Sequence, residues 1–306
     1  MIVPDNHFVR RFLPALLLNL PPRVERLERL PEGTAIPAVI HQTFADTDLD
    51  PAIQRSIREM REANPGWEYR FYGDRDCATF IEREYGPRIL DYYDRINPKY
   101  GAARADLFRY LLMYKCGGLY LDIKSVARLP LDRAIGRDDR FVLSRWPNGQ
   151  SEDFRGWGIH PELAHCAGGE LQQWHIIAAP GHPFLKAVIE NVLRNIDRYI
   201  PSIHDTGKVG VLRVTGPIAY TLGIAPLLET CPHRMARQAD LGLSYSVFRA
   251  RADAPEPLQG IHYSQQTESI VRIGPARQVV SALFAMALSI YRLFKAARTG
   301  LVHSRK

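Results

Sequence analysis

Residues 102–125 read AARADLFRYLLMYKCGGLYLDIKS and carry the strongest structural signal in the chain. Apolar residues recur in this stretch at the three-and-four spacing of a helix: Leu107, Tyr110, Leu111 and Tyr114. This spacing predicts a helix over 102–115. The double glycine 117–118 ends it, and the apolar run 119–123 predicts a short buried strand. A helix that passes directly into a strand is typical of an α/β fold.

The segments before this stretch alternate in the same way. The β-branched run 36–43 predicts a first strand, and the alternation of bulky and polar residues over 67–72 predicts a second. Between them, Asp50 as N-cap and Pro51 at the first helical position begin a helix over 50–63. A further helix is expected over 76–85. This order predicts an α/β fold with a doubly wound, mostly parallel sheet flanked by helices.

The second half is less regular. Strands are expected over 141–143 and 172–178, and a helix over 183–199. Thr215 is expected to cap a further helix that opens at Gly216-Pro217. The polar, glycine-rich stretch 148–169 predicts a long loop.

Three charged residues stand out in the deciding stretch. Asp106 and Arg109 are one helical turn apart and project from one helix face, and Asp122 ends the following strand. Ligands of doubly wound sheets bind beyond the carboxyl ends of the strands. A carboxylate and a guanidinium can hold sugar hydroxyls or a phosphate by charge-assisted hydrogen bonds. An ion pair on the helix surface is the alternative, but the adjoining double glycine and Asp122 favour a ligand site.

The run 103–110, followed by 117–122, strongly resembles the DXD-containing sugar-transferase family. This family is glycosyltransferase family 32-like and includes initiating mannosyltransferases and the transferases of capsular polysaccharide and lipopolysaccharide. Segments 36–43, 64–69, 181–184 and 215–217 and the late His262 match in the same order, so the resemblance covers roughly residues 36–265. It implies a GT-A-like fold, a nucleotide-sugar donor and retention of the anomeric configuration.

The resemblance also implies roles for individual residues. Asp122 corresponds to the first acid of the DXD-like motif and is expected to be catalytic, facing ribose, sugar or metal. Donor-binding residues are expected at His41, Gln42 and Thr43 near the nucleotide, and at Asp106, Arg109 and Tyr120 near the sugar. For His41, a hydrogen-bonded structural histidine is an equal alternative.

Lys124 departs from the family pattern, because it replaces the second acid of the motif. An ammonium has no lone pair for a metal ion. Two alternatives stay open: Asp122 holds Mn²⁺ or Mg²⁺ together with His262 or Glu268, or Lys124 itself is catalytic and neutralises the diphosphate. We therefore expect weaker metal dependence than in relatives with two acids. Loss of catalysis, leaving a sugar-nucleotide-binding partner subunit, is the competing hypothesis.

The charge of the chain is concentrated at one end. The formal net charge is +7, and residues 269–306 contain seven basic residues and no acidic one, so the remaining basic residues equal the 33 acidic residues in number. We predict an N-terminal extension at 1–35, a glycosyltransferase domain at 36–268 and a basic amphipathic C-terminal helix at 269–306. That helix either lies on an anionic membrane surface or packs against the domain. A basic tail on a neutral body argues against nucleic-acid binding.

These observations predict a nucleotide-sugar-dependent hexosyltransferase. It would move a hexose or N-acetylhexosamine to a saccharide or lipid-linked acceptor in bacterial surface polysaccharide synthesis. The expected location is the cytoplasm, peripheral on the inner face of the cell membrane. Three acids in or beside the long loop are candidates to face the acceptor: Asp153, Glu162 and Glu170. His160, His165 and His175 lack metal-ligand spacing and receive no role, and the tryptophans are expected in the core or lining a site.

Overall fold

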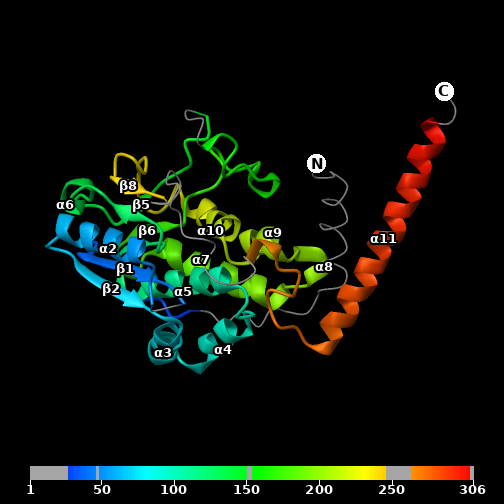
Figure 1. Cartoon of the computed structure of the whole chain (residues 1–306), viewed down its shortest axis with the longest axis horizontal. Coiled ribbons are helices and arrows are strands. Elements are labelled where there is room, and N and C mark those ends of the chain that lie inside the picture. The colour runs from blue at the N-terminus through cyan, green and yellow to red at the C-terminus, as the bar shows by residue number, and fades with distance from the viewer. Residues whose placement is uncertain (1–26, 46–47, 150–153, 246–262, 304–306) are drawn as a thin grey trace.

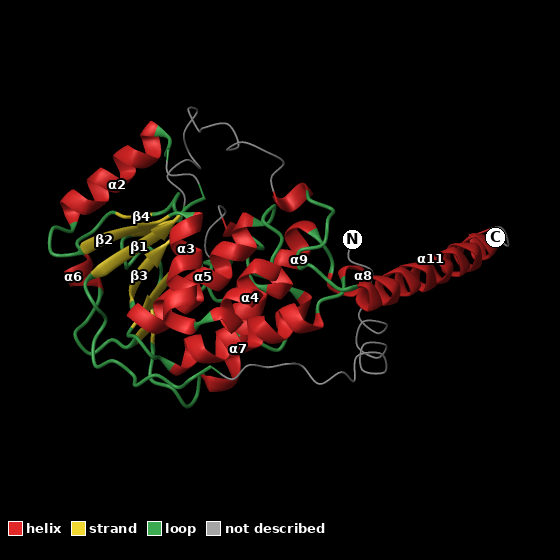
Figure 2. Ribbon diagram, turned by 90° about the horizontal axis from the view of Figure 1, so that it is seen from below, coloured by secondary structure: helices red, strands yellow, loops and turns green. Residues whose placement is uncertain are grey.

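The computed structural model describes residues 27–45, 48–149, 154–245 and 263–303. A six-stranded sheet has the order β2-β1-β3-β6-β5-β7, and β4 pairs with β8 in a small second sheet (Figures 1 and 2). The strands are β1 (Val39–Thr43), β2 (Glu68–Tyr72), β3 (Gly118–Leu121), β4 (Val126–Ala127), β5 (Phe141–Leu143), β6 (His175–Ala178), β7 (Arg234–Met235) and β8 (Leu243–Ser244). The α-helices are α2 (Pro51–Ala63), α3 (Asp74–Tyr85), α4 (Pro87–Arg95), α5 (Gly101–Cys116), α6 (Leu131–Ala134), α7 (Pro183–Arg198), α8 (Pro201–His204), α9 (Gly207–Val214), α10 (Pro217–Ile224) and α11 (Pro275–His303).

The direction of the strands confirms the predicted α/β class. β1 is parallel to β2 and β3, and β5 is parallel to β7, whereas β6 is antiparallel to both of its neighbours. Five of the six strands therefore run the same way. The sheet is mostly parallel, with one reversed strand at its centre.

Alternate residues of each strand pack into two different cores. In β3, Leu119 and Leu121 join a core that contains α2 and α6, whereas Tyr120 joins the larger core formed with α3, α4, α5 and α7. Figure 2 shows α3 and α5 on one side of the sheet and α2 on the other. This two-sided burial explains the nearly continuous apolar sequence of β3. It also confirms the prediction of a doubly wound sheet flanked by helices.

The double glycine fits the junction between α5 and β3. Gly117 has φ +65° and caps α5, and Gly118 has φ +100°. A Cβ at Gly118 would lie 2.6 Å from the carbonyl oxygen of Val39, so a larger residue would force β3 away from β1. The predicted helix stop is therefore also the point at which β3 enters the sheet.

The structure differs from the sequence prediction at several helices: α4, α6, α8 and α9 were not expected, and the start of α10 was misplaced. No helix was assigned to α4, although Pro87 stands at its first helical position. The expected N-cap role of Thr215 is wrong, because α10 begins at Pro217 with Gly216 as its N-cap. The backbone at Thr215 has not yet entered the helix.

The domain boundaries shift slightly at both ends. Residues 27–35 form no helix, and Gly33 N donates to Pro180 O at 2.8 Å, so this part of the N-terminal extension packs on the domain. Residues 1–26 lie outside the described part. Ile270 and Val271 are fully buried in the main core, and α11 begins only at Pro275.

Helix α11 extends away from the rest of the molecule (Figures 1 and 2). Val280, Phe284 and Leu288 pack near Ile200 and Ile203 at its base. Within the ranges that the structure describes, no helix has the length and apolar character needed to cross a membrane.

Candidate active site

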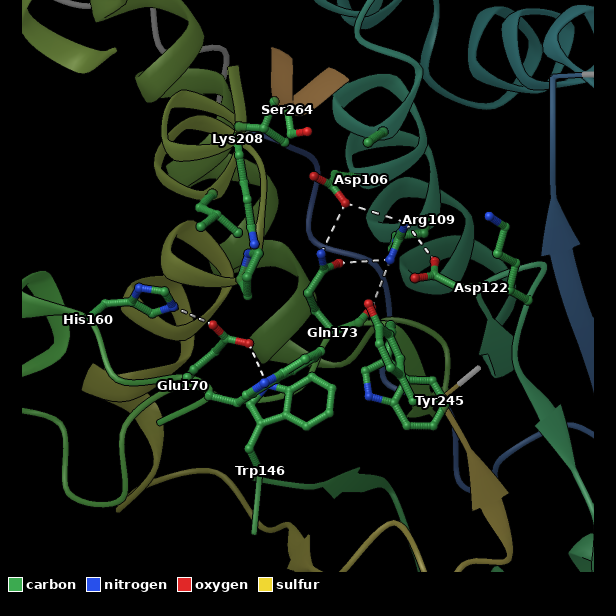
Figure 3. A pocket seen from close by; sticks show the side chains of 18 of the residues that line it. Asp106, Arg109, Asp122, Trp146, His160, Glu170, Gln173, Lys208, Tyr245 and Ser264 are labelled. Carbon is green, nitrogen blue, oxygen red and sulfur yellow. Dashed lines mark hydrogen bonds and ion pairs between the residues drawn. The ribbon is translucent and has the colours of Figure 1, made fainter. Parts of the chain in front are cut away.

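A cavity of about 670 Å³ opens at the carboxyl edge of β3. Its wall contains Asp106, Arg109, Asp122 and Lys124 together with residues of the segment before β6 (Figure 3). The volume is within the range of small-molecule sites in proteins, roughly 300 to 1,000 Å³. The cavity is therefore large enough for a substrate of two or more rings.

The topology explains why these residues meet. The amino end of α5, which carries Asp106 and Arg109, lies at the edge where β3 ends and Asp122 follows. Because β6 is antiparallel to β3, the residues that lead into β6 reach the same edge. Asp122 N donates to Trp174 O at 2.8 Å and fixes the two segments together.

The three predicted charged residues form one network. Arg109 Nη2 lies 2.9 Å from Asp122 Oδ1 and 3.4 Å from Asp106 Oδ1. The guanidinium also lies over the ring of Tyr120, with its Cζ atom 4.7 Å from the ring centroid. Only 3% of Asp106 and 4% of Arg109 are exposed. These two residues thus form the buried floor of the cavity rather than a surface ion pair.

Two uncharged residues complete the network. Gln173 Nε2 donates to Asp106 Oδ1 at 3.1 Å, and Arg109 Nη1 donates to Gln173 Oε1 at 2.9 Å. Thr215 Oγ1 donates to Asp106 Oδ2 at 2.9 Å, which is the role it has in place of the predicted cap. Gln173 was not among the predicted site residues, because no local pattern marks a glutamine 67 residues away as a partner of Asp106. Thr215 lies in a segment that matches the family, but its role was misread.

Asp122 is the acid of this network that meets the cavity most openly. Its side chain is 33% exposed. Arg109 and the hydroxyl of Tyr120, at 3.4 Å, both contact Oδ1, and no residue of the described ranges bonds to Oδ2, which keeps its lone pairs for a ligand. Burial raises the pKa of Asp122 to about 6, and Arg109 opposes this shift. Burial also raises the pKa of Asp106, with Arg109 and Thr215 opposing.

The structure corrects the role expected for the β1 residues. His41, Gln42 and Thr43 are buried, and none of them is part of the described cavity wall. His41 Nε2 lies 3.1 Å from Gly117 O, and burial lowers the pKa of His41 to about 4. The structural alternative for His41 therefore holds, because its ring is used to join β1 to the end of α5.

The side chains of Gln42 and Thr43 also bond to the backbone of neighbouring segments. Gln42 Nε2 donates to the carbonyl oxygens of Asp122 and Ser125, each at 3.2 Å, and so holds the turn that presents Asp122. Thr43 Oγ1 donates to Tyr72 O at 2.8 Å. Tyr120 is likewise buried beneath Arg109. These side chains position the site and do not line it.

Lys124 lines the cavity two residues beyond Asp122 and is exposed. It has no ion-pair partner among the described residues. Glu268, one proposed partner for a metal at Asp122, is bound instead by Lys99 and by Asn97, whose Nδ2 lies 3.3 Å from it, and it is not in the described cavity wall. Glu268 is therefore not placed to share a metal with Asp122, and His262, the other partner named for that metal, lies outside the described residues.

The donor set that the structure describes does not fit a metal ion by itself. Within the described ranges, no group of three or more His, Cys, Asp or Glu residues could hold one. Asp122 supplies one unengaged oxygen, with a guanidinium 2.9 Å from the other and an ammonium two residues away.

The other end of the cavity is aromatic and contains a second acid. Trp146, Trp157 and Tyr245 contact one another edge to face, with ring centroids 4.9 to 5.9 Å apart. Glu170 accepts a hydrogen bond from Trp146 Nε1 at 2.7 Å, and His160 Nε2 lies 2.7 Å from its other oxygen.

Of the three acids that were candidates to face the acceptor, one lies in this part of the cavity. Glu170 lines the cavity, whereas Glu162 is paired with Arg213 and is not in the described wall. Asp153 lies outside the described residues. His160, which received no role, is placed in the site.

Comparison with known proteins identifies the central segment. Residues 50–142 match the family model described as "Glycosyltransferase sugar-binding region containing DXD motif". This match confirms the resemblance drawn from residues 103–122.

The curated relatives include several fungal proteins. Inositol phosphoceramide mannosyltransferase 3 of Schizosaccharomyces pombe is 28% identical over 62% of this chain and 45% of its own length. Mannosyl phosphorylinositol ceramide synthase SUR1 of Saccharomyces cerevisiae is 27% identical over 60% of this chain and 41% of its own. The initiation-specific alpha-1,6-mannosyltransferase of Candida albicans is 30% identical over 43% of this chain and 34% of its own. The chain thus spans less than half the length of these relatives.

Among solved structures, PaToxG Glycosyltransferase aligns with a TM-score of 0.47 and 13% identity, over 74% of this chain and 80% of that chain.

Proposed function

Since this chain contains the sugar-binding region of the DXD glycosyltransferase family, we propose that it transfers a hexose from a nucleoside diphosphate sugar to an acceptor hydroxyl. The observation that carries this proposal is the Asp106–Arg109–Asp122 network at the floor of a cavity of about 670 Å³. The buried ion pairs hold the carboxylate of Asp122 in one position. A carboxylate in a fixed position can orient a ligand that carries several hydroxyl groups.

The donor sugar is proposed to be mannose. The relatives quoted above are named as mannosyltransferases or mannosyl-transferring synthases, and the sugar-binding segment is the part of the chain that matches the family. An N-acetylhexosamine is the second donor class. Retention of the anomeric configuration follows the family resemblance, and an NMR spectrum of the first product would show it directly.

The residues divide the work as follows. Asp122 Oδ2 accepts a hydrogen bond from a hydroxyl of the donor, while Arg109 and Tyr120 hold its other oxygen. Lys124 neutralises the charge that develops on the diphosphate as the glycosidic bond breaks. We propose that this ammonium lowers the need for Mn²⁺ or Mg²⁺.

The acceptor is proposed to be lipid-linked, with the enzyme peripheral on the inner face of a membrane. Two of the relatives are named for ceramide lipids. We keep bacterial surface polysaccharide synthesis, the role predicted from the sequence, as the proposed setting of this reaction.

Helix α11 supports a membrane location. Val279, Leu283, Met286 and Ile290 are 46 to 59% exposed and fall on one stripe, distinct from the face that packs on α8. No acidic residue occurs from 269 onward, and Arg277 and Arg292 flank the uncharged stretch that carries this stripe. An apolar stripe with basic surroundings fits an anionic bilayer surface.

The membrane proposal is tested by flotation with vesicles that contain anionic lipid. Leu283→Ser with Met286→Ser should leave the protein in the unbound fraction. The control, Met235→Ser, changes a residue of the edge strand β7 that is 47% exposed. Equal flotation of all three proteins would refute the membrane role of α11.

The activity is tested with a panel of UDP- and GDP-sugars, by thermal shift and by release of free sugar. A donor that binds only the folded protein raises its melting temperature. Asp122→Asn should abolish release of sugar from the donor selected in this way. Asp240→Asn, an exposed acid paired with Arg237 and outside the described cavity wall, is the matched control.

The competing function is a non-catalytic sugar-nucleotide-binding subunit, which the lysine at position 124 motivates. It predicts a thermal shift with no sugar released over long incubation. Donor hydrolysis that depends on Asp122 would exclude it.

A further inference from the structure

Lys208 lines the cavity and has no role in the donor chemistry proposed above. It is exposed on α9, and its side chain extends into the cavity (Figure 3). Among the described residues it has no ion-pair partner. Arg213, on the same helix, is by contrast bound to both Glu162 and Asp205.

The position of Lys208 separates it from the donor end. Figure 3 shows Glu170 and His160 on one side of Gln173 and Asp122 on the other, with Lys208 on the side of His160. Lys124 already provides a cation beside Asp122. The cavity therefore has, at each end, an acid and a lysine for which the described part of the chain supplies no ion-pair partner.

The end beside Lys208 is built to receive a hydroxylated ring. Each oxygen of Glu170 has one partner at 2.7 Å within the part of the chain that the structure describes, so the carboxylate retains lone pairs for ligand hydroxyls. Trp146, Trp157 and Tyr245 supply an apolar wall beside it. Such a wall can cover the C–H face of a sugar or cyclic polyol.

We propose that this end is the acceptor subsite, and that it takes a sugar or cyclic polyol that carries a phosphate. Lys208 binds the phosphate, Glu170 accepts a hydrogen bond from a ring hydroxyl, and the aromatic wall covers the ring. The inference rests on the proposed glycosyl transfer and specifies its acceptor.

The phosphate can belong to a lipid headgroup or to a phosphorylated saccharide. The packing of the helices supports the lipid source: α11 packs on α8, and α8 contacts α9, which carries Lys208. A membrane bound by α11 would thus lie on the side of the molecule that holds the acceptor end.

The test measures binding of paired probes by ligand-observed NMR: mannose 6-phosphate against mannose, and myo-inositol 1-phosphate against myo-inositol. In the wild type, each phosphate should tighten binding by about tenfold or more, as expected for a charge-assisted contact. In Lys208→Gln, the affinity ratio within each pair should fall to near one. Lys186→Gln, a lysine of α7 paired with Glu190, should keep the wild-type ratio.

The outcomes separate the alternatives. Preference for either phosphorylated probe that disappears in Lys208→Gln supports the subsite, and the pair that responds identifies polyol or sugar. An unchanged ratio in Lys208→Gln overturns it, and loss of the donor thermal shift alongside that unchanged ratio would assign Lys208 to the donor diphosphate. Failure of every nucleotide sugar to bind the wild type would instead refute the glycosyl-transfer proposal, whatever the probes show.

Discussion

Replacing Asp106 by asparagine tests whether the buried network holds the site together. The substitution keeps the shape of the side chain and removes its charge. Asp106 accepts hydrogen bonds from Gln173 at 3.1 Å and Thr215 at 2.9 Å and lies 3.4 Å from Arg109. All of these contacts are in a region where the carboxylate is 3% exposed.

The expected cost follows from what remains after the change. Breaking a buried ion pair by removing one partner costs about 3 to 5 kcal/mol. Here Arg109 keeps Asp122 at 2.9 Å, and the new amide can still bond to Thr215 after the hydroxyl rotates. We therefore expect Asp106→Asn to lower the free energy of unfolding by about 2 to 3 kcal/mol. Asp106→Ala, which also loses the hydrogen bonds, should cost more.

The measurement is urea unfolding followed by tryptophan fluorescence, together with the donor thermal shift. The midpoint should fall at unchanged slope, and the donor shift should shrink, because Arg109 is less firmly oriented toward Asp122. Asp240→Asn serves as the surface control, with no measurable change expected. An Asp106→Asn protein that unfolds at the wild-type urea concentration would refute the structural role assigned to this network.

Three further predictions concern the donor end. The pKa of Asp122 is raised to about 6, so kcat/KM should fall as the pH drops through 6 and the carboxylate gains a proton; a flat profile down to pH 4.5, with folding verified by fluorescence, would contradict this. Gln42→Ala removes two hydrogen bonds to the turn that carries Asp122 and should lower kcat/KM about tenfold, corresponding to about 1.4 kcal/mol, while unchanged kinetics would deny Gln42 its positioning role. The wild-type activity should survive EDTA. Lys124→Ala should lower kcat about 100-fold and make the residual rate respond to Mn²⁺. Complete loss of wild-type activity on chelation would show that a metal, not Lys124, neutralises the leaving group.

The local signals in the sequence predicted the part of the fold that carries the donor end. The spacing within 102–115 and the double glycine determined α5 and β3 because both effects are local: apolar periodicity sets the buried faces, and φ +100° at Gly118 requires glycine. The proximity of Asp106, Arg109 and Asp122 followed from one helical turn and one strand end. These three residues lie within 17 positions of one another in the sequence, so the helix and the strand that follows it are enough to predict that their side chains meet.

The remaining parts depend on contacts between distant segments. Gln173 and Thr215 reach Asp106 across 67 and 109 residues, and no local pattern indicates which polar side chain fills such a place. His41 is a residue that was predicted to bind the donor and does not line the cavity. It was assigned to the donor because it lies in the first strand of the sheet, close to the expected ligand site. Its side chain nevertheless points to the end of α5, where Gly117 O holds it. Its neighbours Gln42 and Thr43 are buried as well, so β1 is covered on both faces and none of the three side chains reaches the described cavity wall.

The reversed strand β6 explains why one cavity contains two different chemical environments. In an all-parallel sheet, the residues that lead into a strand lie at the edge opposite the site. Here β6 runs against β3 and β5, so the residues that precede it, Glu170 to Trp174, lie beside Asp122 and beside Trp146, which follows β5. Gln173 belongs to this segment and bonds to the donor-end floor, whereas Glu170, three residues earlier, bonds to the aromatic wall. A donor and an acceptor held at these two places are therefore positioned by one short stretch of chain, and a change in its backbone should alter both affinities together.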